Sequence, residues 1–179
     1  MPTVEAMSDL KIDTTDIRQG DIRLLDSPTA QDLLTTTLIS RLAYTAKDGT
    51  PRVIPVNHLW NGTELVVAAF ADTFKIRALQ ARPDVAVCID TADGLPQVLM
   101  LRGRVDMTDV EGVLPEYAVM QRRLLGEEAS SAYLAAIDQP GLRMVRIALR
   151  PTWVGVLDFQ DRFPALVPEP VKAALGAKN

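Results

Sequence analysis

The chain has 179 residues, of which 47% are hydrophobic and 23% are charged, and this indicates one globular domain with a sizeable core. Its net charge of −4 argues against a nucleic-acid partner, because phosphate binding needs a basic face. Because Cys88 is the single cysteine, the chain cannot form an internal disulfide. One cysteine and one histidine, His58, also argue against a zinc site within one chain.

The first 26 residues are polar and mixed, and we interpret them as an N-terminal arm with a possible short strand at "DIRLL". They lack the apolar stretch of a signal peptide, and no segment approaches the roughly 20 apolar residues of a membrane span. We therefore expect a cytoplasmic protein that does not contact a membrane. Residues 27–160 form the predicted main domain, and residues 161–179 form a C-terminal tail with a weak terminal helix.

A helix is predicted at "DSPTAQDLLTTT". Ser27 is the candidate N-cap and Pro28 takes the first helical position, where its missing N–H is not needed. Leu33, Leu34 and Leu38 give this helix an apolar face that can pack on a core.

Three predicted strands follow, with the sequences "ISRLAYTA", "PRVIPVNHLW" and "ELVVAAF". The turns between them carry Asp48-Gly49 and Asn61-Gly62, which are strong hairpin signals. In the second strand Arg52, Ile54 and Val56 share one face, and Val53, Pro55 and Asn57 share the other. Pro55 cannot donate to a ladder, so it marks an edge strand or an irregularity.

The second half of the chain continues this pattern. A short helix is predicted at "DTFKIRALQA", a buried strand containing Cys88 at "DVAVCID", and a further strand at "VLMLRGRVDMT". The glycine inside this last strand, Gly103, indicates a bulge or a close approach of another backbone. A helical segment over 110–136 is broken near Gly126, and its apolar face is predicted to contain Leu124, Leu125, Tyr133, Leu134 and Ile137. The sequence "LRMVRIALRPTWVGVLDF" is either a strand pair or one long strand bent at Pro151.

Hairpin turns imply antiparallel pairing, and a sheet of many short strands tends to close on itself. The sequence therefore predicts an α+β domain built on a small antiparallel barrel of six or seven strands.

The start of the helix at Thr73 is the first candidate site. Lys75 and Arg77 lie in its first turn, where the helix macrodipole disfavours cations. Free backbone N–H groups, the Thr73 hydroxyl and Lys75 would together form a cradle for a monophosphate. The alternative is a solvated helix turn in which the cations point into water.

Other candidates are weaker. Arg52 to Asn57 form an interrupted edge strand whose free backbone groups can meet a ligand, or an ordinary edge strand. His58 is a weak candidate for proton donation, although a lone histidine on a strand is more often packed or exposed. Gln97 can donate an amide hydrogen bond to a planar ring. Trp60 and Trp153 are better explained as core or interface residues than as cofactor contacts.

No nucleophile elbow, Walker loop, dinucleotide glycine pattern or paired-histidine metal motif occurs in the sequence. Hydrolytic chemistry therefore has no support, no metal is expected, and any chemistry is expected to come from a bound cofactor.

Taken in order, these segments resemble the pyridoxamine 5'-phosphate oxidase-like family, the flavin- and deazaflavin-dependent split-barrel oxidoreductases. The matching features are Pro51 to Val56 as "P-x-x-x-P-V", the Asn61-Gly62 turn, Thr73-Phe74-Lys75 with Leu79, Arg82-Pro83-Asp84-Val85, and Gly103. The resemblance implies a six-stranded antiparallel split barrel with peripheral helices, and a homodimer with the cofactor between subunits.

The resemblance also implies site residues. Lys75 and Thr73, beside Phe74, correspond to the ligands of the cofactor phosphate. Arg52, Val53, Ile54, Pro55, Val56 and Asn57 correspond to the strand that lines the flavin ring and ribityl chain. Ala69, Phe70 and Gln97 correspond to further cofactor contacts. The implied activity is hydride transfer between FMN, or a deazaflavin coenzyme of the F-420 type, and a small organic substrate.

The chain departs from the vitamin B6 oxidases of this family, because Phe74 stands where they carry arginine and their C-terminal arginine motif is not present. We therefore expect a different substrate, with a slight preference for the deazaflavin. That cofactor has a longer acidic tail, for which Arg77, Arg82, Arg102 and Arg104 are candidate ligands. The alternative function is a non-catalytic flavin- or tetrapyrrole-binding protein, with His58 as the axial ligand of a haem.

Overall fold

The computed structural model describes residues 14, 16–91, 94–159, 162–164 and 166–175. Its strands are β1 (Ile39–Thr45), β2 (Pro51–Asn57), β3 (Leu59–Trp60), β4 (Leu65–Phe70), β5 (Asp84–Asp90), β6 (Gln97–Glu111), β7 (Arg143–Leu149) and β8 (Trp153–Asp158). Its helices are the 3-10 helix η2 (Ile22–Asp26) and the α-helices α1 (Pro28–Thr36), α2 (Phe74–Ala81), α3 (Pro115–Leu125), α4 (Glu127–Ile137) and α5 (Glu169–Ala174).

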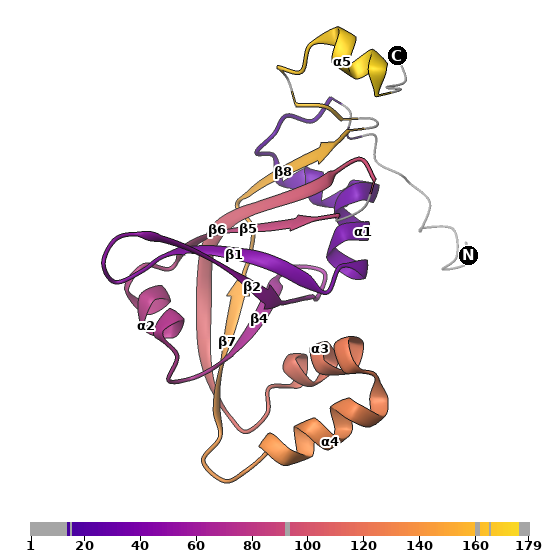
Figure 1. Cartoon of the computed structure of the whole chain (residues 1–179). Helices are drawn as coiled ribbons and strands as arrows, with labels where there is room; N and C mark the ends of the chain where they lie inside the picture. The colour runs from indigo at the N-terminus through magenta and orange to yellow at the C-terminus, as the bar shows by residue number, and fades with distance from the viewer. Residues whose placement is uncertain (1–13, 15, 92–93, 160–161, 165, 176–179) are drawn as a thin grey trace, which may run out of the picture.

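The strands form one curled antiparallel sheet in the order β2-β1-β5-β6-β7-β4-β3, and β8 also pairs with β6 (Figure 1). Curling brings the edge strand β2 back toward β4, but within the described residues no ladder joins the two. The fold is therefore the predicted α+β split barrel. The described residues form eight strands rather than six or seven, because the expected strand over 51–60 divides into β2 and β3 at His58, and the segment 142–159 contains both β7 and β8.

Strand β6 is the longest element of the sheet and has a different partner at each end. Its first half pairs with β8 from Gln97 to Arg102, and its second half pairs with β7 from Val105 to Glu111. Both partners run along the same edge of β6, while β5 occupies the other edge. β7 and β8 are therefore one long strand interrupted at 150–152, which is the bent-strand alternative predicted from Pro151.

Gly103 lies opposite this interruption. A Cβ atom at Gly103 would lie 2.9 Å from the carbonyl oxygen of Arg150 and 2.9 Å from the Leu149 side chain. The close backbone approach predicted for this glycine is therefore confirmed. Only glycine lets β6 pass the break between β7 and β8 at this distance.

The helices lie around the barrel. Ser27 caps α1 by accepting a hydrogen bond from the Ala30 N–H, as predicted, and Leu33 and Leu34 of α1 are fully buried in the core. α2 follows β4, and α3 and α4 form a hairpin inserted between β6 and β7 (Figure 1). Within the part of the chain that the structure describes, no helix is long and apolar enough to cross a membrane.

Three local expectations were wrong. The segment "DIRLL" is a 3-10 helix and not a strand, because the Asp21 carboxylate accepts a hydrogen bond from the Arg23 N–H and closes a turn. The helical segment begins at Pro115, not near 110, because β6 continues to Glu111 beside β7. Leu124 and Leu125 are 44% and 45% exposed, because α3 turns Met120 toward the barrel instead.

The end of the N-terminal arm lies along the outer edge of β8. The Gly20 N–H donates to the Val154 carbonyl at 2.8 Å, and the Gln19 side chain bonds both the N–H and the carbonyl of Val156. Arg162 donates to the same Val156 carbonyl and to the carbonyls of Thr14 and Ile17. The described part of the arm and the start of the tail are therefore held together on one strand.

We predict that Gly103→Ala lowers the free energy of unfolding by about 2 kcal/mol, because the added methyl group overlaps the Arg150 carbonyl in a packed sheet. Urea denaturation monitored by circular dichroism measures this loss. Thr108→Ala, at an exposed position of the same strand, is the control and should change the free energy by less than about 0.5 kcal/mol. A Gly103→Ala variant as stable as the parent would contradict the close approach.

Candidate functional site

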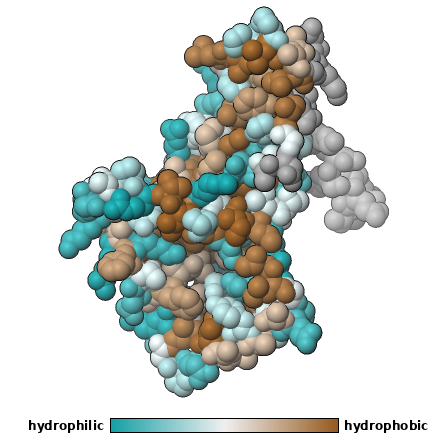
Figure 2. Space-filling view, viewed as in Figure 1, coloured by the Kyte–Doolittle hydropathy of each residue, from teal (hydrophilic) through white to brown (hydrophobic). Residues whose placement is uncertain are grey.

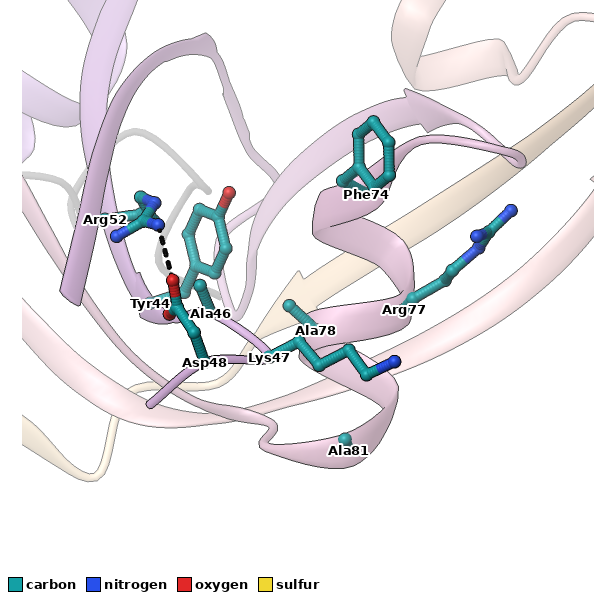
Figure 3. Close-up of a pocket in the computed structure, with 9 residues that line it drawn as sticks. All are labelled: Tyr44, Ala46, Lys47, Asp48, Arg52, Phe74, Arg77, Ala78 and Ala81. Carbon is teal, nitrogen blue, oxygen red and sulfur yellow. Dashed lines mark hydrogen bonds and ion pairs between the residues drawn. The ribbon is translucent and has the colours of Figure 1, made fainter. Parts of the chain in front are cut away.

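A groove of about 880 Å³ lies between the β1–β2 hairpin and one side of α2. It is lined by Tyr44, Lys47, Asp48, Arg52, Phe74 and Arg77, together with the alanines Ala46, Ala78 and Ala81 (Figure 3). The helix contributes positions 74, 77, 78 and 81, which lie on one face because of the 3.6-residue period. The groove therefore follows from the spacing of α2 and from the adjacent hairpin turn.

The two walls of the groove each present an aromatic ring. Tyr44 lies on β1 directly opposite Arg52 of β2, and its hydroxyl points away from the hairpin turn (Figure 3). Phe74 begins α2 and is 87% exposed, with the Arg77 guanidinium 6.0 Å from its ring centre. The groove is thus open and has flat apolar surfaces on both sides.

One ion pair lies at the hairpin side of the groove. Arg52 donates to the Asp48 carboxylate at 3.0 Å and also bonds the Thr50 hydroxyl. The Thr50 hydroxyl and backbone N–H, followed by Arg52, hold the pKa of Asp48 at about 2. Asp48 therefore remains a carboxylate at neutral pH and fixes the Arg52 side chain at the mouth of the groove.

Unpaired cations gather around α2. Among the described residues, Lys47, Lys75 and Arg77 have no carboxylate within 4.0 Å, and Arg82 bonds only the Ala46 carbonyl. Most other arginines have such a partner, as Arg41 has in Asp90. A chain of net charge −4 has thus collected free positive charge in one place.

Lys75 is the most unusual of these cations. It is half-buried at the start of α2, and this loss of water lowers its pKa. The helix start also destabilises the Lys75 ammonium, because the macrodipole is positive there. Thr73 occupies the N-cap position but donates its hydroxyl to the Phe70 carbonyl and does not cap the helix. An anion at this helix end would compensate both Lys75 and the uncapped N–H groups.

A second, smaller concavity of about 390 Å³ lies at the N-terminal end of α2. Its walls are Phe70 to Thr73 on one side and Gly141 to Arg143 on the other. The Phe70 ring meets Tyr117 of α3 edge-on at 6.2 Å, and the Tyr117 and Tyr133 hydroxyls lie 2.8 Å apart. The α3–α4 hairpin therefore supports one wall of this concavity, and the loop after α4 forms the other.

The residues of β2 that are predicted to contact the cofactor lie on two opposite faces of the strand. Val53 and Pro55 point outward and are exposed, and Asn57 is partly exposed. Ile54 and Val56 point inward, and Val56 is buried in the core. The inward residues can therefore offer a ligand only backbone groups.

Several predicted residues lie outside the groove. Ala69 is buried in the core. Gln97 donates to the buried Asp158 at 2.8 Å, and Asp158 also accepts from Thr29 of α1. Gln97 thus joins β6, β8 and α1, and it lines neither concavity.

The other candidate ligands of an acidic tail have partners of their own. Arg102 stacks on the Trp153 ring at 3.9 Å, and Arg104 faces Asp84 at 4.0 Å. Of the four arginines proposed for this role, Arg77 alone lines the groove.

His58 lies beneath the surface between β2 and β3 and is 1% exposed. Neither ring nitrogen makes a hydrogen bond of normal geometry within the described residues. Burial lowers the pKa of His58 to about 4; the nearby backbone of Leu34 partly opposes this shift, and the Arg123 charge adds to it. This neutral, enclosed ring does not line the groove.

Sequence reasoning missed Tyr44, Lys47 and Asp48 as groove residues. A signal for them was present, because the Asp48-Gly49 turn fixes the hairpin register and so sets Tyr44 opposite Arg52. The packing of α2 beside this hairpin is a tertiary contact, which no local pattern reveals.

Comparison with known proteins gives the family context of this geometry. A family model described as pyridoxamine 5'-phosphate oxidase matches residues 26–100, and the resemblance seen in the sequence is confirmed there. The chain has no match among curated proteins.

Three solved structures show the same fold. One titled "F420 Reductase" is 26% identical, with a TM-score of 0.55 over 70% of this chain and 94% of its own. A conserved hypothetical protein from Mycobacterium tuberculosis is 15% identical, with a TM-score of 0.56 over 71% and 81%. HutZ, the haem storage protein from Vibrio cholerae, is 15% identical, with a TM-score of 0.55 over 72% and 92%.

We predict that His58 makes the protein less stable in mild acid. The unfolded chain takes up a proton near pH 6.5 but the native His58 does so only near pH 4, so stability falls as the pH drops through this window. Between pH 7 and pH 5 the free energy of unfolding should fall by about 2 kcal/mol from this residue alone.

Urea denaturation at both pH values measures this loss. His58→Leu replaces the imidazole with an apolar side chain of similar size. In this variant the free energy of unfolding should fall by about 2 kcal/mol less between pH 7 and pH 5 than in the parent. Equal pH slopes for the parent and the variant would show that His58 is not held neutral.

Proposed function

We propose that this chain, whose residues 26–100 match the pyridoxamine 5'-phosphate oxidase family, binds a flavin-type cofactor and uses it for oxidoreduction of a small organic substrate. The cofactor is FMN or a deazaflavin coenzyme of the F-420 type. The 26% identical structure titled "F420 Reductase" supports the deazaflavin, and the family description supports FMN.

One observation carries the proposal, namely the half-buried Lys75 ammonium at an uncapped helix start, without a carboxylate partner among the described residues. Burial of an unpaired charge is unfavourable, and a bound phosphate removes the cost by charge pairing and by accepting hydrogen bonds from the helix N–H groups. This also explains why cations occupy the end of α2 that the macrodipole disfavours.

The residues present fit such a group. Lys75 and the first N–H groups of α2 would hold the phosphate, and the Thr73 hydroxyl would join them on turning from the Phe70 carbonyl. The edge strand β2, from Arg52 to Asn57, would lie along the planar ring and the ribityl chain. When bound, the cofactor supplies the hydride donor or acceptor, and the protein orients it and excludes water.

We also propose a homodimer in which the outward face of β1 and β2 meets a second copy. Ile39 and Val53 on this face are 39% and 64% exposed, and Pro55 is exposed beside them. Figure 2 shows apolar residues gathered over this part of the molecule. A partner on this face would close the open side of a cofactor lying on β2.

Tetrapyrrole binding has less support. HutZ is 15% identical to this chain, and a likeness at this identity shows a shared fold and no shared ligand. A haem ligated by His58 would need a ring that reaches an open pocket, and His58 is 1% exposed and lines neither concavity. No residue is assigned here to proton transfer.

We predict that Lys75→Met weakens cofactor binding at least about tenfold, equal to about 1.4 kcal/mol, because it removes the charge and keeps the aliphatic stem. Titration of the apo-protein with FMN and with the deazaflavin coenzyme, followed by fluorescence, measures this effect and identifies the cofactor. Arg122→Ala, an exposed change on α3, is the control and should bind like the parent.

Anaerobic reoxidation of the reduced, bound cofactor by small unsaturated compounds then tests for hydride transfer. Failure of both cofactors to bind would refute the proposal. Binding without reoxidation by any compound would leave a cofactor-binding protein rather than an enzyme.

A further inference from the structure

We propose that the groove between α2 and the β1–β2 hairpin binds a second ligand, a nucleoside phosphate, beside the cofactor site. The groove is lined by Tyr44, Lys47, Asp48, Arg52, Phe74 and Arg77 (Figure 3). This inference goes beyond the proposed function, because it concerns a different cavity and a different ligand.

The groove adjoins the proposed cofactor site and shares two residues with it. Of the residues assigned to the cofactor, Arg52 and Phe74 alone line the groove, whereas Lys75, Thr73 and Val53 to Asn57 do not. Its volume of about 880 Å³ is far larger than one phosphate needs and falls in the range of small-molecule sites. The cofactor phosphate on Lys75 would therefore leave this cavity free.

The two rings define one half of the ligand. Tyr44 and Phe74 stand on opposite walls, and the Phe74 ring is 87% exposed (Figure 3). Exposed aromatic rings beside cations are the common means by which proteins hold a planar base, since a base stacks on an aromatic face. The ligand is therefore expected to carry a planar ring.

The cations define the other half. Lys47 and Arg77 approach from opposite walls and extend to the same side of α2 (Figure 3). Neither has a carboxylate partner within the described chain. Two unpaired cations from different elements suit a phosphate or diphosphate group.

Asp48 adds a hydrogen-bond acceptor to the groove, and its charge is already paired with Arg52. Its oxygens can accept a further hydrogen bond from a ribose hydroxyl or a base amino group. A bare acidic tail would leave both aromatic rings unused. The combination of two rings, two free cations and one carboxylate thus fits a nucleoside phosphate best.

The test measures binding of ADP to the full-length protein by isothermal titration calorimetry, with and without saturating FMN. We expect ADP to bind in both conditions and inorganic phosphate to bind much more weakly. The double variant Lys47→Ala/Arg77→Ala should weaken ADP binding at least tenfold, and Phe74→Ala should weaken it several-fold. Arg122→Ala is the matched control and should leave ADP binding unchanged.

Variants of each site should leave the other ligand unaffected. Lys75→Met should leave ADP binding unchanged, and the Lys47→Ala/Arg77→Ala variant should leave FMN binding unchanged. ADP binding in a protein that binds neither FMN nor deazaflavin would support the groove while the proposed function fails.

Three results would overturn the inference. The first is absence of ADP binding to a folded parent protein. The second is competition between ADP and FMN with equal sensitivity to Lys75→Met, which would place both in one site. The third is equal affinity for ADP and inorganic phosphate, which would show that the rings do not recognise a base.

Discussion

Strand β6 is the element on which the barrel depends, because among the described strands it alone pairs with three others. It joins β5 along one edge, and β8 and then β7 along the other. One strand can serve two partners in succession only where the backbone passes the break at 150–152, and Gly103 provides that passage. The curl brings β2 toward β4, and α2 packs beside β1.

Charge, rather than shape, distinguishes the candidate site from the rest of the surface. Most arginines elsewhere have a carboxylate partner: Arg146, for example, lies between Glu64 and Glu116 at 2.9 Å and 2.8 Å. Around α2 this pairing stops, and Lys47, Lys75 and Arg77 lack carboxylates among the described residues. Unpaired charge that the fold does not use is a reason to look for a ligand, since a structural role would have supplied a partner.

Much of the fold was predictable because its signals are local. Asp48-Gly49 and Asn61-Gly62 set two hairpins, Ser27 and Pro28 start α1, and Gly103 marks the close approach. Local signals also gave Lys75 at the helix start. They could not give the division of β2 from β3, since that depends on burial of His58 beneath neighbouring elements. They also could not show that the Gln97 amide bonds Asp158, which accepts from Thr29 of α1 as well.

The contacts of the N-terminal arm with β8 have a consequence for solubility. Among the described strands β8 pairs with β6 alone, so without the arm its other edge would present the backbone groups of Val154 and Val156. An uncovered edge of this kind is a template for strand addition by another molecule. Gln19 and Gly20 occupy those groups, and Arg162 holds the arm in place. The described end of the arm therefore blocks strand addition at this edge. We expect that a chain lacking it would aggregate while it is still folded.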